Sequence, residues 1–132
     1  MSTPIGNLND ISLRAIDALK KADYIYAEDT RVTNKLLHFL KIDKKCRTLH
    51  EHNEEAVSHD IIELLNKQNE IVLVSDAGTP SVSDPGYYLI QQCIKEDIIF
   101  SLVPGPSSVI SALVMSGLST SSFSFLGFVP RK

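Results

Sequence analysis

The sequence predicts an α/β fold in which helices flank a mostly parallel sheet. Short β-prone apolar runs of about six residues alternate with segments of roughly ten to fifteen residues that have helical spacing, which is the pattern of successive βαβ units. Gly, Pro, Ser and Asp gather directly after the apolar runs, where an open parallel sheet binds its ligands. The 132 residues, 43% of them hydrophobic, suit one domain with one core.

In the first half of the chain, two predicted helices alternate with two predicted strands. Residues 11–22 place apolar side chains at helical spacing, and Asp10 is the expected N-cap of this helix. Residues 24–29 are β-prone and apolar until two carboxylates, so a strand is expected there. Residues 33–41 again have helical spacing, and residues 46–50 are a candidate for a short strand.

The second half of the chain repeats this alternation. Residues 54–68 have a clear amphipathic pattern with acidic residues in the first turn, as the helix dipole favours. Residues 70–76 have the strongest strand pattern in the chain. After them we expect a helix at 86–97, a strand at 98–104 and a helix at 107–117.

The net charge of −3 is unevenly distributed. Residues 1–50 carry nine Lys and Arg against six Asp and Glu, a balance of +3, whereas residues 51–100 carry two against ten, a balance of −8. This distribution argues against a strongly basic face for nucleic acid across the whole chain. A modest basic cluster remains, and its members are Lys35, Lys41, Lys44, Lys45 and Arg47. We favour a solvated helix end and loop for it over a nucleic-acid contact.

The cysteines and the first residues bear on the compartment. Cys46 and Cys93 fit no metal or redox spacing, which is typical of reduced thiols in a cytoplasmic protein. The opening MSTPIGNLND has neither a basic start nor a long apolar stretch, so it does not resemble a signal peptide. Because no run of about 18 apolar residues occurs, we expect no membrane contact.

Five motifs lie at predicted strand ends or helix starts: TPIGNLND (3–10), AEDTR (27–31), LHEHNEE (49–55), SDAGTPSVSDPG (75–86) and VPGPSS (103–108). The fourth motif is longer than an ordinary βα connection. It has no lysine of a phosphate-binding loop and no GxGxxG pattern, so it suits a neutral or positive ligand held mainly by main chain. A structural Ω-type turn is the alternative. Within it, Asp84 is expected only to cap the next helix.

VPGPSS has the composition of a stiff strand-to-helix turn. Its prolines remove backbone donors, and Gly105 permits a close approach to the backbone. Ser107 or Ser108 can cap the helix that follows. The free N–H groups at such a helix start can hold a carboxylate or a phosphate, although a purely structural turn is the alternative.

AEDTR and LHEHNEE carry the titratable candidates. Glu28 and Asp29 beside Arg31 predict either an acid/base site or an ion-pair brace. His50 and His52 point the same way on a strand, but no third ligand has a suitable spacing, so no metal site is expected. Contact with a polar substrate is favoured for the histidines, and a helix cap is expected at Asn53.

Taken in order, TPIGNLNDISLRA, AEDTR, LHEHNE, SDAGTPSVSDPG and VPGPSSVISAL closely resemble the N-terminal, Rossmann-like domain of the ribosomal RNA small-subunit methyltransferase I family. This family has the tetrapyrrole methylase fold, and the resemblance spans essentially the whole chain. It implies S-adenosyl-L-methionine as cofactor, methylation of a cytidine ribose 2′-hydroxyl in 16S rRNA of the 30S subunit, a cytoplasmic location and a homodimer. The alternatives are a tetrapyrrole-precursor methylase of the same fold and a non-catalytic Rossmann-like assembly module.

The resemblance also implies site residues. Three segments should line the cofactor cleft: Pro4, Ile5 and Gly6; Asp76, Ala77, Gly78, Thr79 and Pro80; and Gly105, Ser107 and Ser108. The methyl donor is a sulfonium cation, which agrees with a loop without lysine and with a polar contact from Asp76. Asp29 and Glu28 are the candidate bases for the 2′-hydroxyl, with His50 or His52 behind them, and Arg31 is a candidate phosphate contact.

The chain departs from the family pattern at both ends. Residues 1–120 are expected to form the methylase domain, and residues 121–132 to begin a linker to an absent second domain. Only Met1 and Ser2 precede TPIGNL, where the family has a strand of its own. We therefore expect a fragment or a clipped start, which binds S-adenosylmethionine weakly or not at all. The strands at 70–76 and 98–104 should lack a shared neighbour and expose backbone groups.

Overall fold

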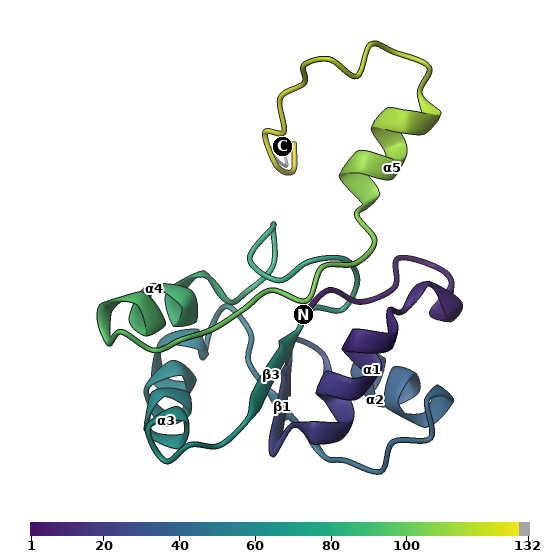
Figure 1. Cartoon of the computed structure of the whole chain (residues 1–132). Coiled ribbons are helices and arrows are strands. Elements are labelled where there is room, and N and C mark those ends of the chain that lie inside the picture. The colour runs from purple at the N-terminus through teal and green to yellow at the C-terminus, as the bar shows by residue number, and fades with distance from the viewer. Residues whose placement is uncertain (130–132) are drawn as a thin grey trace.

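The computed structural model describes residues 1–129 and confirms the predicted α/β fold (Figure 1). Its three strands are β1 (Tyr24–Ala27), β2 (Cys46–Thr48) and β3 (Ile71–Val74). The α-helices of the described residues are α1 (Leu13–Lys21), α2 (Thr30–Phe39), α3 (Glu54–Asn66), α4 (Tyr87–Lys95) and α5 (Ser108–Met115). A short 3-10 turn, Leu8–Asp10, precedes α1. Each predicted helix is therefore present, with ends shifted by a few residues.

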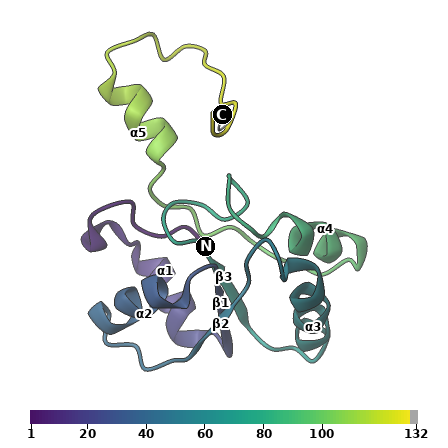
Figure 2. The same cartoon turned by 180° about the vertical axis from the view of Figure 1, so that it is seen from behind.

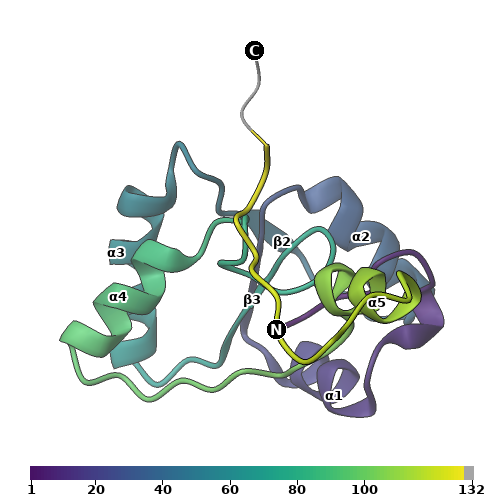
Figure 3. The same cartoon turned by 90° about the horizontal axis from the view of Figure 1, so that it is seen from above.

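The strands form a parallel sheet in the order β2-β1-β3. Helices α1 and α2 cover one face of this sheet, and α3 and α4 cover the other (Figures 1, 2 and 3). The central strand alternates between the two resulting cores, because successive side chains of a strand point to opposite faces. Ile25 and Ala27 pack toward α1 and α2, whereas Tyr26 packs with Ile61 and Leu89 of α3 and α4.

The helix starts correct two expectations. Asp10 is not the N-cap of α1, because the Ser12 hydroxyl accepts the Ala15 N–H at 3.1 Å and Asp10 belongs to the preceding 3-10 turn. Asn53 does occupy the N-cap position of α3, but its side chain caps no helical N–H. Its Oδ1 instead accepts the backbone N–H of His50 at 2.7 Å, which holds the turn between β2 and α3.

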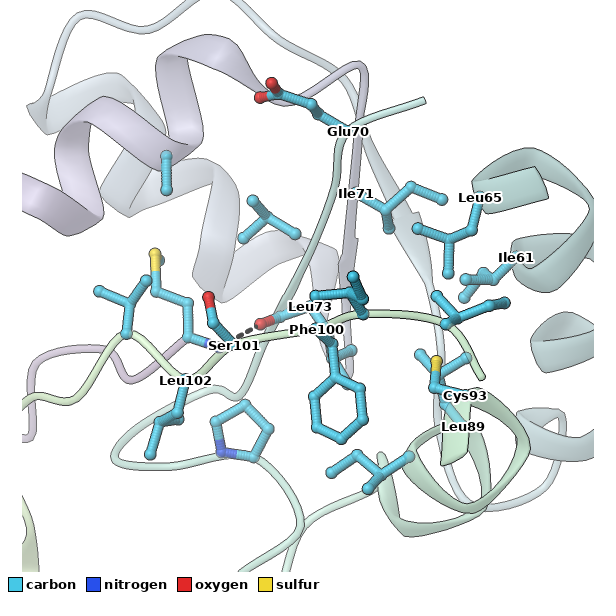
Figure 4. A pocket seen from close by; sticks show the side chains of 18 of the residues that line it. Ile61, Leu65, Glu70, Ile71, Leu73, Leu89, Cys93, Phe100, Ser101 and Leu102 are labelled. Carbon is cyan, nitrogen blue, oxygen red and sulfur yellow. Dashed lines mark hydrogen bonds between the residues drawn. The ribbon is translucent and has the colours of Figure 1, made fainter. Parts of the chain in front are cut away.

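The predicted strand at 98–104 is wrong. This segment has no strand assignment, and it is linked to β3 through the first two residues, since Met1 N donates to Leu73 O of β3 and Ser2 N donates to Val103 O of the segment. A strand is stable only when a neighbour satisfies its backbone groups, and within residues 1–129 no strand fills this position. Within residues 1–129, β3 has no strand neighbour on the side away from β1. An open, mostly apolar groove of about 470 Å³, here called the strand groove, lies between β3 and residues 98–103 (Figure 4).

Helix α5 stands apart from the two cores. It extends away from the sheet together with residues 116–129, and no residue of α5 is buried (Figures 1 and 2). Residues 121–129 of the predicted linker form no helix or strand, and its last three residues lie outside the described residues. Among the helices of residues 1–129, none is long and apolar enough to cross a membrane.

Candidate functional site

The carboxyl ends of β1 and β3 meet at one edge of the sheet, and the first and fourth motifs are joined there. Thr3 and Gly78 exchange backbone hydrogen bonds, with Thr3 N donating to Gly78 O at 2.8 Å and Gly78 N donating to Thr3 O at 3.1 Å. The Thr3 hydroxyl donates to Ser75 O at 3.0 Å, and the Ser75 hydroxyl donates to Gly78 O at 3.0 Å. Gly78 has φ of +86°, so the turn favours glycine at this position. The beginning of SDAGTPSVSDPG is therefore fixed by main chain.

The fifth motif packs against the same place through Ser2. Ser2 N donates to Val103 O at 2.9 Å, and its hydroxyl lies 2.8 Å from the Thr79 hydroxyl. A Cβ at Gly105 would stand 2.9 Å from Ser2 Cβ, so only glycine permits this close packing. In VPGPSS, Ser107 is the N-cap of α5, and its hydroxyl accepts the Ile110 N–H at 3.5 Å. Residues 2–3 thus bring together the three segments that were predicted to line a cofactor cleft.

Asp76 links the second motif to the fourth. Its Oδ1 accepts the backbone N–H of Asp29 at 3.0 Å, which fixes the end of β1 against the loop after β3. Asp76 also borders a small pocket of about 40 Å³, which Thr3, Pro4 and Ser75 help to line.

Asp29 is fully engaged by its neighbours. It is the N-cap of α2, and its Oδ1 accepts the backbone N–H of Arg31 at 2.8 Å. The Arg31 guanidinium forms an ion pair with the same carboxylate, with Nη2 donating to Oδ2 at 2.6 Å and Nε donating to both oxygens. The side-chain hydrogen bonds from Arg31 lower the pKa of Asp29 to about 2. The ion-pair brace is the better description of this pair, since a carboxylate with so low a pKa is a weak proton acceptor.

Glu28 has the opposite character. Partial burial raises the pKa of Glu28, and the charges of Asp76, Asp84 and Asp29 raise it further, while His50 opposes them. Burial and the charge of Asp76 also raise the pKa of Asp84. The carboxylates of Glu28, Asp76 and Asp84 therefore form one acidic cluster at the sheet edge. Because like charges disfavour full ionisation, Glu28 holds a proton more readily than an ordinary glutamate.

His50 lies at the border of this acidic cluster. Its Nδ1 is buried and has no hydrogen-bond partner among the described residues. The His50 and His52 rings contact edge to face at a centroid distance of 5.9 Å, and His52 is exposed. The predicted grouping of Glu28 with His50 is thus present. Within residues 1–129, no three His, Cys, Asp or Glu side chains gather closely enough to hold a metal ion.

The acidic helix start in LHEHNEE has a role that the sequence did not reveal. Oε1 of Glu54 accepts the backbone N–H groups of Gly86 and Tyr88, each at 2.8 Å, and so caps α4 from α3. The N-cap residue of α4 is Gly86, which has no side chain to cap the helix, and the predicted cap from Asp84 is not formed. Gly86 has φ of +125°, and a Cβ there would stand 2.8 Å from Leu73 Cδ2. The end of the long loop is therefore held from α3, a contact 32 residues away in sequence.

The basic cluster is partly occupied within the fold. The Arg47 guanidinium lies over the Tyr24 ring, 4.2 Å from its centroid, and donates to the Tyr26 hydroxyl at 3.3 Å. Lys44 donates to the carbonyl of Ala22. These contacts support the structural interpretation of these two residues over a free nucleic-acid surface.

Comparison with known proteins gives a consistent result. The sequence profile of the family described as Tetrapyrrole (Corrin/Porphyrin) Methylases matches residues 2–129. A protein of Hydrogenobaculum sp. named Ribosomal RNA small subunit methyltransferase I is 53% identical over 131 residues, which cover 98% of this chain and 57% of that protein. A protein of the same name from Halalkalibacterium halodurans is 50% identical over 100% of this chain and 46% of its own length. One from Thermotoga maritima is 45% identical over 99% of this chain and 59% of its own length. The chain spans about half the length of the curated relatives it matches.

Proposed function

Because the chain belongs to the tetrapyrrole methylase family, as its motifs predicted, we propose that it forms the cofactor-holding part of an S-adenosyl-L-methionine-dependent rRNA methyltransferase. The proposed substrate is 16S rRNA in the 30S subunit, in line with the names of the relatives. The proposed reaction is transfer of a methyl group to the ribose 2′-oxygen of a cytidine.

The observation that carries this proposal is the junction of three segments around residues 2–3. Thr3 binds the loop at Gly78, and Ser2 contacts Thr79 and Val103, so the predicted cofactor segments meet at the carboxyl end of β3. This position is where open α/β sheets hold ligands. The junction offers main-chain groups and the carboxylates of the acidic cluster, without a lysine in the loop. This donor set fits a sulfonium cofactor, since a nearby carboxylate attracts a cation and a lysine repels it.

The proposed residues divide the chemistry between them. S-adenosylmethionine supplies an electrophilic methyl group when bound. The junction of residues 3–6, 76–80 and 105–108 orients the reactants, and such alignment supplies much of the acceleration of a displacement reaction. Glu28 is the proposed proton acceptor for the 2′-hydroxyl, and we prefer it to Asp29 because the pKa of Glu28 is raised and that of Asp29 is lowered.

The substrate contacts are proposed from exposure and geometry. The side chain of Arg31 is 87% exposed, and Asp29 holds its guanidinium at the start of α2. The exposed donors of this guanidinium outside the pair with Asp29 suit an rRNA phosphate. His50 and His52, beside the acidic cluster, are the proposed contacts for the ribose or base of the target nucleotide.

The wider organisation is also a proposal. Residues 1–120 form the methylase domain, and residues 121–132 lead toward a further domain of a longer protein. The described part of the second segment, residues 121–129, is exposed, has no helix or strand and lies apart from the sheet, which supports its assignment as a linker (Figure 1). A homodimer in the cytoplasm is proposed for that longer protein.

The substrate class can be tested with radiolabelled S-adenosylmethionine and two acceptors, 30S subunits from a strain that lacks the gene and a tetrapyrrole precursor. The assay uses the full-length protein that contains residues 1–129 as the enzyme. We expect label in 16S rRNA, at a cytidine 2′-oxygen by mass spectrometry of nucleosides. Label in the tetrapyrrole alone favours the alternative that the family description suggests, and label in neither favours the assembly module.

The proposed proton acceptor is tested in the same assay with Glu28→Gln. We expect this variant to lose on the order of a hundredfold in turnover at neutral pH, as general-base catalysis contributes about 10²–10⁴-fold. Glu63→Gln on the exposed face of α3 is the matched control, because it makes the same chemical change outside the acidic cluster. Turnover of Glu28→Gln equal to that of Glu63→Gln would remove Glu28 from this role.

A further inference from the structure

His50 lies beside Glu28 because the strands that precede them are neighbours in the sheet. Ala27 of β1 is paired with Thr48 of β2, and the Leu49 N–H donates to the Ala27 carbonyl at 2.8 Å. Glu28 and His50 directly follow the two residues of this last hydrogen bond. Because neighbouring strands lie about 4.8 Å apart, the chain brings both residues to the same part of the sheet edge.

Asn53 fixes the turn that carries His50. Its Oδ1 accepts the His50 N–H at 2.7 Å, and its Nδ2 donates to the Thr48 carbonyl at 3.4 Å. The Asn53 N–H donates in turn to the His50 carbonyl at 3.0 Å. Asn side chains commonly stabilise turns by such bonds to nearby backbone. One side chain therefore holds the backbone on both sides of Leu49 and sets where the His50 ring begins.

Nδ1 of His50 is a buried polar atom without a bonding partner. Among residues 1–129 nothing donates to it or accepts from it, although the residue as a whole is only half-buried. A neutral imidazole carries its proton on one nitrogen and accepts at the other. With the proton on Nε2, the Nδ1 lone pair is free to accept. Buried polar atoms without partners are rare, so one at a candidate site calls for a role, of which proton transfer is one.

Glu28 is the group beside His50 that gains a proton in the proposed reaction. Partial burial raises the pKa of Glu28, and three carboxylates raise it further: Asp76, Asp84 and Asp29. The charge of His50 acts in the opposite direction. An imidazole is ordinarily a stronger base than a carboxylate, so it is the better recipient of a proton that leaves Glu28.

We propose that His50 receives, at Nδ1, the proton that Glu28 removes from the substrate hydroxyl, and that Asn53 positions the ring for this transfer. The inference rests on the function proposed above. The ribose oxygen bonds the methyl carbon, whose former bonding pair stays on the cofactor sulfur, and the hydroxyl proton joins the Glu28 carboxylate. The proton then moves to the Nδ1 lone pair, and the half-buried imidazolium loses one proton to solvent. His52, which is exposed, keeps the substrate contact proposed above.

The coupling between His50 and Glu28 is tested without any activity. The Glu28 carboxyl carbon is followed by NMR through a pH titration of the 132-residue chain. His50→Gln should raise the pKa of Glu28 further, because the charge of His50 lowers it. His38→Gln, exposed in the last turn of α2, is the matched control and should leave this pKa unaltered. An equal pKa of Glu28 in the wild type and in His50→Gln overturns the proposal.

The tautomer of His50 gives a second readout in the same chain. The ¹⁵N shifts of the neutral ring should show a proton on Nε2 and none on Nδ1. A proton on Nδ1 overturns the proposal, since that nitrogen then has no lone pair to accept another proton.

The transfer itself is tested by turnover of the full-length protein on 30S subunits. His50→Ala should lower kcat at least about tenfold, and millimolar imidazole should restore part of the loss by accepting the proton in place of the ring. His52→Ala should raise the KM for 30S subunits and gain nothing from imidazole. A loss in His50→Ala without rescue, or equal rescue of both variants, overturns the proposal.

The positioning role of Asn53 is tested with two variants. Asn53→Leu removes the acceptor of the His50 N–H, whereas Asn53→Asp retains an oxygen there. Asn53→Leu should lower kcat and raise the pKa of Glu28 as His50→Gln does, and Asn53→Asp should come closer to the wild type in both. A pKa of Glu28 that Asn53→Leu leaves unchanged contradicts the positioning role, because a loss of stability alone does not move it.

Failure of this proposal can be told from failure of the proposed function. Wild-type enzyme that leaves the 30S subunits unlabelled contradicts the function. Labelled 30S subunits together with full activity of His50→Ala contradict only the role of His50. The titration of Glu28 is read in the chain without substrate, so its result does not depend on the acceptor.

Discussion

Strand β3 borders two regions that differ in how their backbone is satisfied. At its carboxyl end, the Thr3 and Ser75 hydroxyls donate hydrogen bonds to main-chain carbonyls and Asp76 accepts one from the Asp29 N–H, which together hold the loop in one arrangement. Along its outer edge, among residues 1–129, hydrogen bonds of Met1 and Ser2 link β3 to the segment across the strand groove. The difference shows that a few hydrogen bonds between segments distant in sequence can fix a loop, whereas a sheet edge requires a whole strand. The candidate functional residues therefore lie at the carboxyl end of β3, where the backbone is held by hydrogen bonds.

The largest effect is expected from a substitution at Gly86, at the end of the loop that follows β3. Gly86→Ala should destabilise the fold by about 2–4 kcal/mol, since the new Cβ would stand 2.8 Å from Leu73 Cδ2 at a φ of +125°. Urea denaturation followed by circular dichroism measures this loss. Gly117→Ala is the matched control, because Gly117 also has positive φ but has no atom within 4 Å of the new Cβ. A loss below 1 kcal/mol for Gly86→Ala would show that the loop is less firmly held than its contacts indicate.

A second prediction concerns the outer edge. The pKa of the Met1 amine is about 6 in the folded chain against 8.0 ordinarily, so the unfolded chain binds more protons between these values. Stability should therefore rise as the pH increases from 6 to 8, by at most about 2–3 kcal/mol from this group. Urea denaturation across this pH range, compared between the free chain and a chain acetylated at the Met1 amine, isolates the contribution of this amine to stability. Identical pH profiles for the two chains would mean that the Met1 amine is solvated in the folded chain and not buried against Leu73.

A third prediction removes the cap of α4. Glu54→Ala should cost about 1–2 kcal/mol, as losing a helix cap does, because the N–H groups of Gly86 and Tyr88 lose their acceptor. Glu54→Gln retains an acceptor oxygen and should cost less. Glu55→Ala, on the exposed side of the same helix turn, is the control and should change stability by less than about 0.5 kcal/mol. Equal losses for Glu54→Ala and Glu55→Ala would argue that the cap is not formed in solution.

The smallest effect on stability is expected at the ion-pair brace. Arg31→Met should leave the free energy of unfolding nearly unchanged, since the guanidinium is exposed and such pairs contribute little. If Arg31 contacts rRNA phosphate, the same variant should raise the KM for 30S subunits. Lys35→Met on the exposed face of α2 is the control for loss of one positive charge. A KM that rises equally in both variants would indicate general electrostatic attraction in place of a specific contact.

The sequence predicted the parts of the molecule that depend on local pattern. The helices and β1, β2 and β3 follow from apolar periodicity and were placed within a few residues. The predicted strand at 98–104 was wrong, because no strand among residues 1–129 pairs with this segment and an apolar pattern alone does not satisfy its backbone groups. Asp10 failed as a helix cap because Ser12 lies nearer the helix start.

The candidate site was predictable in its segments but not in its roles. The motifs identified which strand ends would meet, since parallel strands share one edge. The roles of Glu54, Asp84 and Ser2 come from contacts over 30 or more positions, which no spacing in one sequence reveals. Glu28 and Asp29 are adjacent and chemically alike, and only the position of Arg31 and of the acidic cluster separates their pKa values.

The most direct measurement is a map of backbone amide shifts in the 132-residue chain as S-adenosylmethionine is added at millimolar concentration. NMR detects binding of the weak affinity expected here. We predict that the shifts change in residues 3–6, 76–80 and 105–108, while Ile71 and residues 98–103 along the strand groove do not respond. Changes confined to the strand groove, or no changes in the three loop segments at saturating cofactor, would contradict the placement of the cofactor at the carboxyl end of β3.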